Sequence, residues 1–350
     1  MICFINKRVA FEKANGTEHN PDLYAWTLCY LDTDDNYPFA SQFVATFGEY
    51  GYIPGVNMKF YKEPNMDRHL RYFSLCAGIG TAESAIHSVY RNAICVGFSE
   101  MDENALKVYR KHFLDHRNFG DALKLDPDTL PDFDLLVGGI PCQPFSRQSN
   151  NRTNFDDERS KLFDCFLQIL ESKAPQHFLL ENVPMSPEPQ AKISSDLKVQ
   201  PVEINANHWT AQNRNRLYWC NWYVHQPLEK PSPTLQDIIQ HDAPHATTRY
   251  KDLPPHPPKD RVCSVRRNSA TGVVSFRTDG KATTLVASDC YQSIVLENGN
   301  YRHYTVRERE RLQGLPDDYT SCEGLRDAEK KRLLGNAMTL PAIEYVIRQL

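Results

Sequence analysis

From Arg71 onward, short apolar runs with the spacing of strands alternate with amphipathic segments that have the spacing of helices. RYFSLCAGIG reads as a strand entering a glycine turn, TAESAIHSVYRNA as a helix, ICVGFSE as a strand and MDENALKVYRKHF as a helix. FDLLVGGIPC, SKLFDCFLQILES and QHFLLENV continue the pattern as strand, helix and strand. This order predicts an α/β fold, a doubly wound and mostly parallel sheet with helices on both faces, which binds ligands at the carboxyl ends of its strands.

The pattern divides the chain into four segments. Residues 1–68 are rich in aromatic side chains and form an N-terminal accessory segment of unknown role. Residues 69–224 carry the strand and helix alternation, and residues 225–300, rich in proline and histidine at first, form a small irregular insert. Residues 301–350 are helical again and return to the sheet domain.

Composition places the chain in a broad class. Its 350 residues are 41% hydrophobic and 24% charged, as in ordinary globular proteins, and no apolar run approaches the length of a membrane span. We therefore expect a soluble, intracellular protein with no membrane partner. The ten cysteines form no CxxC pair and no zinc-type cluster, which predicts reduced thiols and no metal.

Charge is unevenly distributed. The net charge is −4, yet residues 245–311 hold twelve arginines and lysines against seven acidic residues. This basic stretch suits contact with phosphate, although composition alone equally allows a solvated loop.

Three strand ends carry groups that suit an adenosine-containing cofactor. CAGIG, residues 76–80, is a glycine turn in which backbone N–H groups approach a ligand. Glu100 ends the next strand, where it can accept from ribose hydroxyls, and Asp121 is placed to hold an adenine amino group. The spacing of about twenty residues from the turn to Glu100 leaves NAD open.

Three further strand ends carry chemistry of another kind. In GGIPCQPFS, two glycines and two prolines fix the backbone around Cys142. LLENV places Glu181 at the end of the neighbouring strand, and QNRNR puts Arg214 and Arg216 on one face of another. Guanidinium groups beside a thiol lower its pKa and bind phosphate or a carbonyl oxygen.

These motifs together resemble the cytosine-C5 DNA methyltransferase family, over residues 71–350. CAGIG is similar to its cofactor loop, PCQPFS to its catalytic motif, ENV to its glutamate motif and QNRNR to its Gln-x-Arg-x-Arg motif; VRERERLQGLP and GNAMTLP complete the family's order. The resemblance implies a class I methyltransferase fold, S-adenosyl-L-methionine as cofactor and double-stranded DNA as partner, with residues 225–300 as the target-recognition insert.

The resemblance also implies a set of site residues. Catalytic roles fall to Cys142 as nucleophile, Glu181, Arg214 and Arg216. Cofactor contacts fall to Cys76, Ala77, Gly78, Ile79, Gly80, Glu100, Met101, Asp121, Ala122, Pro141, Leu162, Asn336, Ala337 and Met338. DNA contacts fall to Ser146, Arg159, Arg266, Arg267 and Arg277.

Two departures from the family pattern stand in the cofactor loop. Cys76 occupies a position where the family usually has an aromatic residue, and Thr81 one where it has glycine. The short insert is similar to that of the de novo branch of animal DNA methyltransferases.

Three alternative functions differ from this expectation in the sequence features they require. Relatives that methylate tRNA usually carry a Cys-Phe-Thr tripeptide in the insert, which is absent here because Cys263 precedes Ser264 and Cys290 precedes Tyr291. A catalytically silent DNA-binding regulator normally lacks the motif cysteine or glutamate, and both are present. A cysteine hydrolase has little support, since no histidine adjoins the strand-end motifs.

Overall fold

The computed structural model describes residues 69–140, 161–241, 243, 262–267, 271–288, 294–297 and 300–350, with the strand residues 2–3, 29–32 and 57–60. The chain forms two compact units, Met1–Asn65 and Met66–Leu350. In the first unit, the described residues form an antiparallel sheet in the order β1 (Ile2–Cys3), β2 (Cys29–Asp32) and β3 (Asn57–Phe60). The division lies close to the boundary at residue 68 that composition predicts, and the role of this segment stays open.

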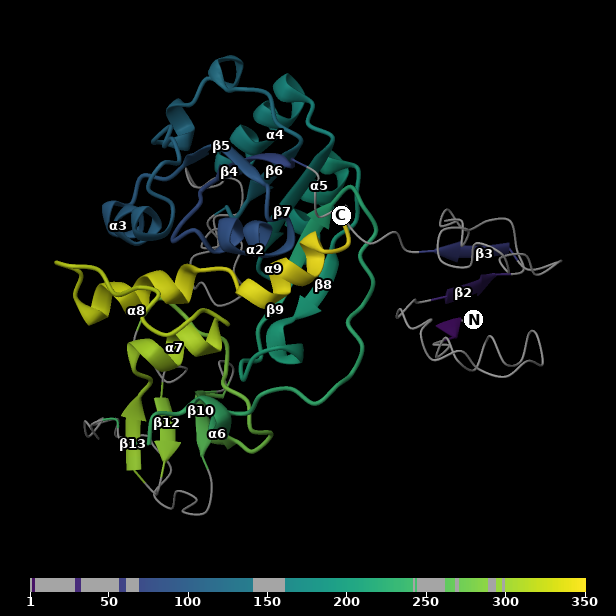
Figure 1. The fold of residues 1–350 in the computed structure, drawn as a ribbon. Helices are drawn as coiled ribbons and strands as arrows, with labels where there is room; N and C mark the ends of the chain where they lie inside the picture. Colours follow the sequence, from purple (N-terminus) through teal and green to yellow (C-terminus); the bar gives the residue numbers. More distant parts are fainter. Residues whose placement is uncertain are drawn as a thin grey trace, which may run out of the picture. The chain divides into compact units, whose positions relative to one another are not determined.

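The second unit contains a six-stranded sheet, shown in Figure 1. Its strand order is β5 (Ile94–Ser99), β4 (Arg71–Leu75), β6 (Leu135–Gly138), β7 (His177–Asn182), β9 (Asn215–Cys220) and β8 (Val202–Asn205). The first four strands are parallel to one another, and β9 is antiparallel to both its neighbours. The predicted doubly wound, mostly parallel sheet is confirmed.

Side chains alternate between the two faces of this sheet because successive residues of a strand point in opposite directions. Tyr72, Leu135 and Leu179 join one buried cluster with helices α2 (Thr81–Val89) and α9 (Leu340–Ile347). Their chain neighbours Phe73, Leu136 and Leu180 join a second cluster with α4 (Lys161–Lys173) and α5 (Pro187–Leu197). Helices therefore cover both faces, as predicted.

The remaining helices are short. They are α3 (Glu103–His112), α6 (Leu235–Ile238), α7 (Val306–Leu312) and α8 (Asp327–Asn336), with the 3₁₀ turns η2 (Ala122–Lys124), η3 (Pro127–Thr129) and η6 (Ala206–His208). Helices α6 and α7 pack with residues of the insert. Within the described part of the chain, no helix is long and apolar enough to cross a membrane.

The insert is more regular than the sequence suggests. Its described residues form, together with residues 301–303, a four-stranded antiparallel sheet in the order β11 (Val274–Arg277), β10 (Cys263–Arg267), β12 (Ile294–Glu297) and β13 (Asn300–His303). The buried Arg302 guanidinium lies 3.0 Å from Glu297 within this sheet and 2.7 Å from Glu308 on α7. These two ion pairs, which share Arg302, link the small sheet to α7.

Strand order reverses beside β4, since β5 pairs with one edge of it and β6 with the other. At such a point the connections leave toward opposite faces and open a crevice at the carboxyl ends of the strands. The sequence motifs singled out above follow the carboxyl ends of β4, β5, β6 and β7.

Candidate active site

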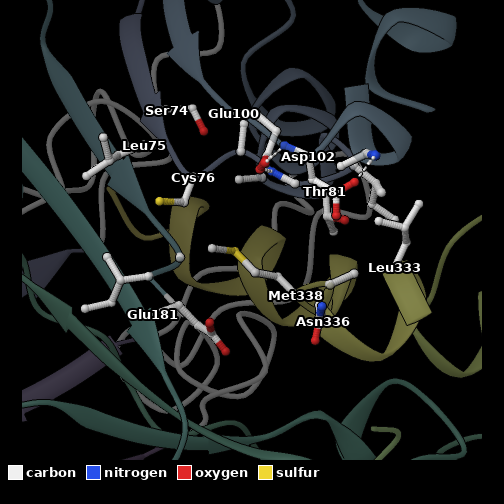
Figure 2. Close-up of a pocket in the computed structure, with 18 of the residues that line it drawn as sticks. Ser74, Leu75, Cys76, Thr81, Glu100, Asp102, Glu181, Leu333, Asn336 and Met338 are labelled. Carbon is white, nitrogen blue, oxygen red and sulfur yellow. Dashed lines mark hydrogen bonds between the residues drawn. The ribbon is translucent and has the colours of Figure 1, made fainter. Parts of the chain in front are cut away.

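A cavity of about 360 Å³ opens at the predicted crevice (Figure 2). Eleven residues assigned from sequence line it, namely Cys76, Ala77, Gly78, Ile79, Glu100, Asn336, Ala337 and Met338 from the cofactor set and Glu181, Arg214 and Arg216 from the catalytic set. Residues from β7, β9 and α8 and from the turns that follow β4 and β5 thus meet in one space although they are far apart in sequence.

The turn after β4 lines this cavity with the backbone of residues 76–79. Cys76, Gly78 and Gly80 all have positive φ, at 57°, 59° and 82°. Glycine adopts this region freely, whereas a cysteine there is strained, so packing must hold Cys76 in place. Burial raises the pKa of the Cys76 thiol, which keeps it protonated and unsuited to be a nucleophile.

Glu100 is held rigidly at the end of β5. One carboxylate oxygen accepts from the Gly78 N–H at 2.8 Å, and the other accepts from the N–H groups of Met101 and Asp102, each at 2.8 Å. A carboxylate oxygen accepts more than one hydrogen bond, so Glu100 retains capacity for ribose hydroxyls. The turn and the strand end therefore form one preorganised wall.

A C-terminal segment packs against the turn that follows β4. The Tyr319 hydroxyl lies 3.1 Å from the Ile79 carbonyl oxygen and 3.0 Å from the Ser84 hydroxyl, and its ring stacks on His112. The QGLPDDY segment thus helps to fix the turn's geometry.

The opposite wall comes from the end of α8. A Cβ placed on Gly335 would lie 2.3 Å from the Val286 backbone, so only glycine permits this close approach. This packing explains the glycine in GNAM and brings Asn336 and Met338 to the cavity.

Glu181 lies at the side of the cavity away from Glu100 (Figure 2) and forms a buried ion pair with Arg216. Arg216 Nε lies 3.0 Å from Glu181 Oε1, and the two residues are 9% and 8% exposed. Burial raises the pKa of the Glu181 carboxyl, while Arg216 and Arg214 act in the opposite direction. The pair places a carboxyl group and a fixed positive charge side by side in the cavity wall.

Arg214 contacts backbone carbonyl groups, which indicates a structural role that the sequence does not suggest. Its guanidinium donates to the carbonyl oxygens of Leu285 at 2.9 Å, Gly335 at 3.3 Å and Ala337 at 2.8 Å. These contacts tie the start of β9 to the insert and to the GNAM segment. Its catalytic role stays a prediction, and its contacts indicate that it positions the cavity wall.

Arg214→Met is expected to lower the free energy of unfolding by about 2 kcal/mol, because three buried carbonyl groups lose a charged donor. Affinity for the cofactor should fall with it, since Gly335 and Ala337 line the cavity. Urea unfolding and calorimetric binding measure the two effects, with the exposed Arg110→Met as the control. Unchanged stability and affinity would show that these contacts are dispensable.

Other assigned residues lie away from the cavity lining. Asp121 accepts from the Leu123 N–H at 3.0 Å and caps η2, so it acts locally in the described structure. Met101 is 68% exposed, and Leu162 packs against the α4–α5 side of the core. Gly80 and Ala122 are also absent from the lining, and the cofactor roles of all five residues stay predictions.

Several assigned residues lie outside what the structure describes. Pro141, Cys142, Ser146 and Arg159 fall within residues 141–160, and the side chains of Arg266 and Arg267 on β10 are likewise not described. Arg277 is described on β11, where its guanidinium pairs with Asp279, 3.1 Å from Nε to a carboxylate oxygen.

The cavity also contains residues that the motif assignment omitted. They include Ser74, Thr81, Asp102, Gly139, Val183 and Leu333. Most adjoin a recognised motif, so extending each motif by one or two positions would have found them. Leu333 stands two positions before GNAMTLP, so the same extension includes it. Among the described residues, no cluster of three or more candidate ligands could hold a metal ion.

Glu83 lies in the first turn of α2, directly after the turn that follows β4, and its carboxyl group is fully excluded from solvent. Its Oε1 accepts from the Tyr109 hydroxyl at 3.2 Å, and burial raises its pKa from 4.5 to about 7. The folded protein keeps this proton between these two values while the unfolded chain loses it. The free energy of unfolding is therefore higher at low pH, where Glu83 is protonated in both states, and this contribution is lost as pH rises through about 7.

Glu83→Gln is expected to remove this pH dependence. Relative to wild type, the variant should gain about 3 kcal/mol of unfolding free energy between about pH 4 and about pH 8. Urea unfolding across that range measures the difference, and the exposed Glu103→Gln is the matched control. If the difference in unfolding free energy between the variant and wild type does not change with pH, then Glu83 has the same pKa in the folded and unfolded protein.

The chain is similar to known proteins over most of its length. The family description "C-5 cytosine-specific DNA methylase" matches residues 70–269 and 265–350. Type II methyltransferase M1.ScrFI of Lactococcus lactis subsp. cremoris is 27% identical over 80% of this chain and 77% of its own length. Type II methyltransferase M.NlaX of Neisseria lactamica is 28% identical over 80% of this chain and 96% of its own length.

Solved structures share the fold. Entamoeba histolytica methyltransferase EhMeth superposes with a TM-score of 0.59 at 18% identity, covering 81% of this chain and 98% of that one. Spodoptera frugiperda DNMT2 gives a TM-score of 0.59 at 16% identity, covering 81% and 99%. The family match spans nearly all of the second unit and includes the cavity residues, and so the chain belongs to the C-5 cytosine-specific DNA methylase family.

Proposed function

We propose that this chain transfers a methyl group from S-adenosylmethionine to C5 of a cytosine in double-stranded DNA, through a covalent bond between Cys142 and C6. The observation that carries the proposal is that one cavity joins the glycine-turn wall to the Glu181–Arg216 pair. Cofactor and base would thus meet in a single space, as methyl transfer requires.

The residues of the cavity fit S-adenosylmethionine. Its volume of about 360 Å³ suits a nucleoside-sized ligand. Glu100 would accept from the ribose hydroxyls, the backbone of the positive-φ turn would lie against the ligand, and Leu333 and Met338 would supply apolar contact. When bound, the cofactor supplies an electrophilic methyl group on a sulfonium sulfur.

The chain's own residues would activate the base. The Cys142 thiolate adds to C6, and its electron pair makes C5 an enamine carbon able to attack the methyl group. Protonated Glu181 donates to N3, where negative charge develops, and Arg216 stabilises charge at O2. After the methyl group is on C5, the C5 proton passes to a base and the C6–S bond breaks, which returns the thiolate.

A cytosine stacked in a duplex cannot present C6 to a thiol, so the base must be flipped into the cavity. The insert would hold the duplex, with phosphate and base-edge contacts from Arg266, Arg267 and Arg277, and Ser146 and Arg159 would contact phosphate beside the catalytic loop. The excess of positive charge over residues 245–311 supports this role. Because Arg277 pairs with Asp279, its contact would require exchange of partners.

The test is to incubate the purified chain with labelled S-adenosylmethionine and mixed-sequence duplex DNA, tRNA or no nucleic acid. The expected result is label at cytosine C5 in DNA alone. Label in tRNA alone would replace DNA by RNA as the substrate. Tight DNA binding without transfer would identify a catalytically silent member of the family.

A further inference from the structure

Thr81 places a buried hydroxyl group in the wall of the cavity. It is the first residue of α2, it is 3% exposed, and it lines the cavity. Within the described parts of the chain, its Oγ1 has no hydrogen-bond partner. A buried hydroxyl without a partner destabilises the fold, so a polar group that enters the cavity and pairs with it would recover that free energy.

The surroundings of Thr81 favour a negatively charged partner. Helix α2 begins at Thr81, after the N-cap residue Gly80, which has no side chain to cap it. The first turn contains one acidic residue, the buried Glu83, and burial raises the pKa of its carboxyl group, so the N–H groups at this helix end still favour a negatively charged partner. Figure 2 shows Thr81 on the side of Asp102 and Leu333, apart from Glu181. The hydroxyl and the helix end therefore act together on the same ligand group.

The nearby carboxylate of Asp102 does not exclude an anion. One of its oxygens accepts from the Asn104 and Ala105 N–H groups at 2.9 and 3.3 Å, and the other lies 2.7 Å from the Arg332 guanidinium. Its charge is thus already balanced by a helix end and a cation.

We propose that the Thr81 hydroxyl donates a hydrogen bond to the carboxylate of the methionine part of S-adenosylmethionine. The identity of the ligand rests on the proposed function, whereas the unpartnered hydroxyl and the uncapped helix are properties of the cavity itself. The family pattern has glycine at this position, so the contact is a feature of this chain that compensates for its altered cofactor loop.

Calorimetric binding of three ligands tests the contact. They are S-adenosylmethionine, S-adenosylhomocysteine and decarboxylated S-adenosylmethionine, which keeps the sulfonium and the amine but lacks the carboxylate. Thr81→Val, which keeps shape and loses the hydroxyl, should bind the first two about tenfold more weakly than wild type does. It should bind the third like wild type, and Thr81→Ser should bind all three like wild type.

Thr81→Ala, which also removes the hydroxyl, repeats the measurement without a branched side chain at the start of the helix. Ser88→Ala is the control, since it removes an exposed hydroxyl from the same helix outside the cavity. Equal weakening for all three ligands, a serine variant as weak as valine, or no weakening at all would overturn the contact. If wild type binds none of the three ligands, the proposed function fails as well, which separates the two failures.

Discussion

Cys142→Ala is expected to leave no detectable methyl transfer, a loss of roughly 10⁴-fold or more in kcat. Cytosine C5 becomes nucleophilic only after a group has added to C6, and no described group in the cavity replaces the thiolate. The Cys76 thiol lies in the same cavity, but burial raises its pKa, so it should stay protonated and inert. Affinity for duplex DNA should change by less than about threefold, because phosphate contacts dominate it.

Transfer of labelled methyl groups and a filter-binding titration measure the two quantities on one preparation. Duplex DNA that carries 5-fluorocytosine adds a second readout, because the fluorine on C5 cannot leave as a proton does and the adduct is retained. Wild type should form a denaturation-resistant complex with it, and Cys142→Ala none. Cys322→Ala, a change outside the cavity, is the matched control. Turnover near the wild-type rate by Cys142→Ala would refute covalent catalysis.

The parallel part of the fold was predictable from sequence because strands buried on both faces consist of nearly continuous apolar residues. QHFLLENV illustrates this, since β7 covers six of its residues, His177–Asn182, and ends at the predicted Glu181 and Asn182. The direction of β9 was not predictable. Its pairing with β7 depends on the chain path through α5 and β8, and an antiparallel strand buried on both faces has the same residue pattern as a parallel one.

The site was predictable where a residue's place on a strand decides its direction. Glu100 and Glu181 end parallel strands, so both face the crevice. The hydrogen bonds of Arg214 could not be predicted from the sequence, because its carbonyl partners Leu285 and Gly335 lie 71 and 121 positions further along the chain. Asp121 shows another limit, since a carboxylate after a strand fits a ligand contact and a local cap equally well.

Glu181→Gln is expected to reduce kcat by about 10²–10³-fold, with the KM for S-adenosylmethionine changed by less than about threefold. Glutamine has nearly the same size and can still accept from Arg216 Nε, so the buried pair keeps its geometry. It cannot transfer a proton toward N3, and an amide donor stabilises developing negative charge less than a carboxylic acid does. The loss should therefore appear in the chemical step rather than in cofactor binding.

The pH profile of kcat separates this role from a merely structural one. Burial raises the pKa of Glu181, which extends the range in which its carboxyl group holds a proton. If the protonated form acts, wild-type kcat falls as pH rises through that pKa, whereas the variant with glutamine lacks this decline. Glu203→Gln, a carboxylate on β8 outside the cavity, should keep the wild-type profile. A profile for Glu181→Gln that is parallel to wild type at all pH values would mean that another group supplies the proton and that Glu181 serves to hold Arg216.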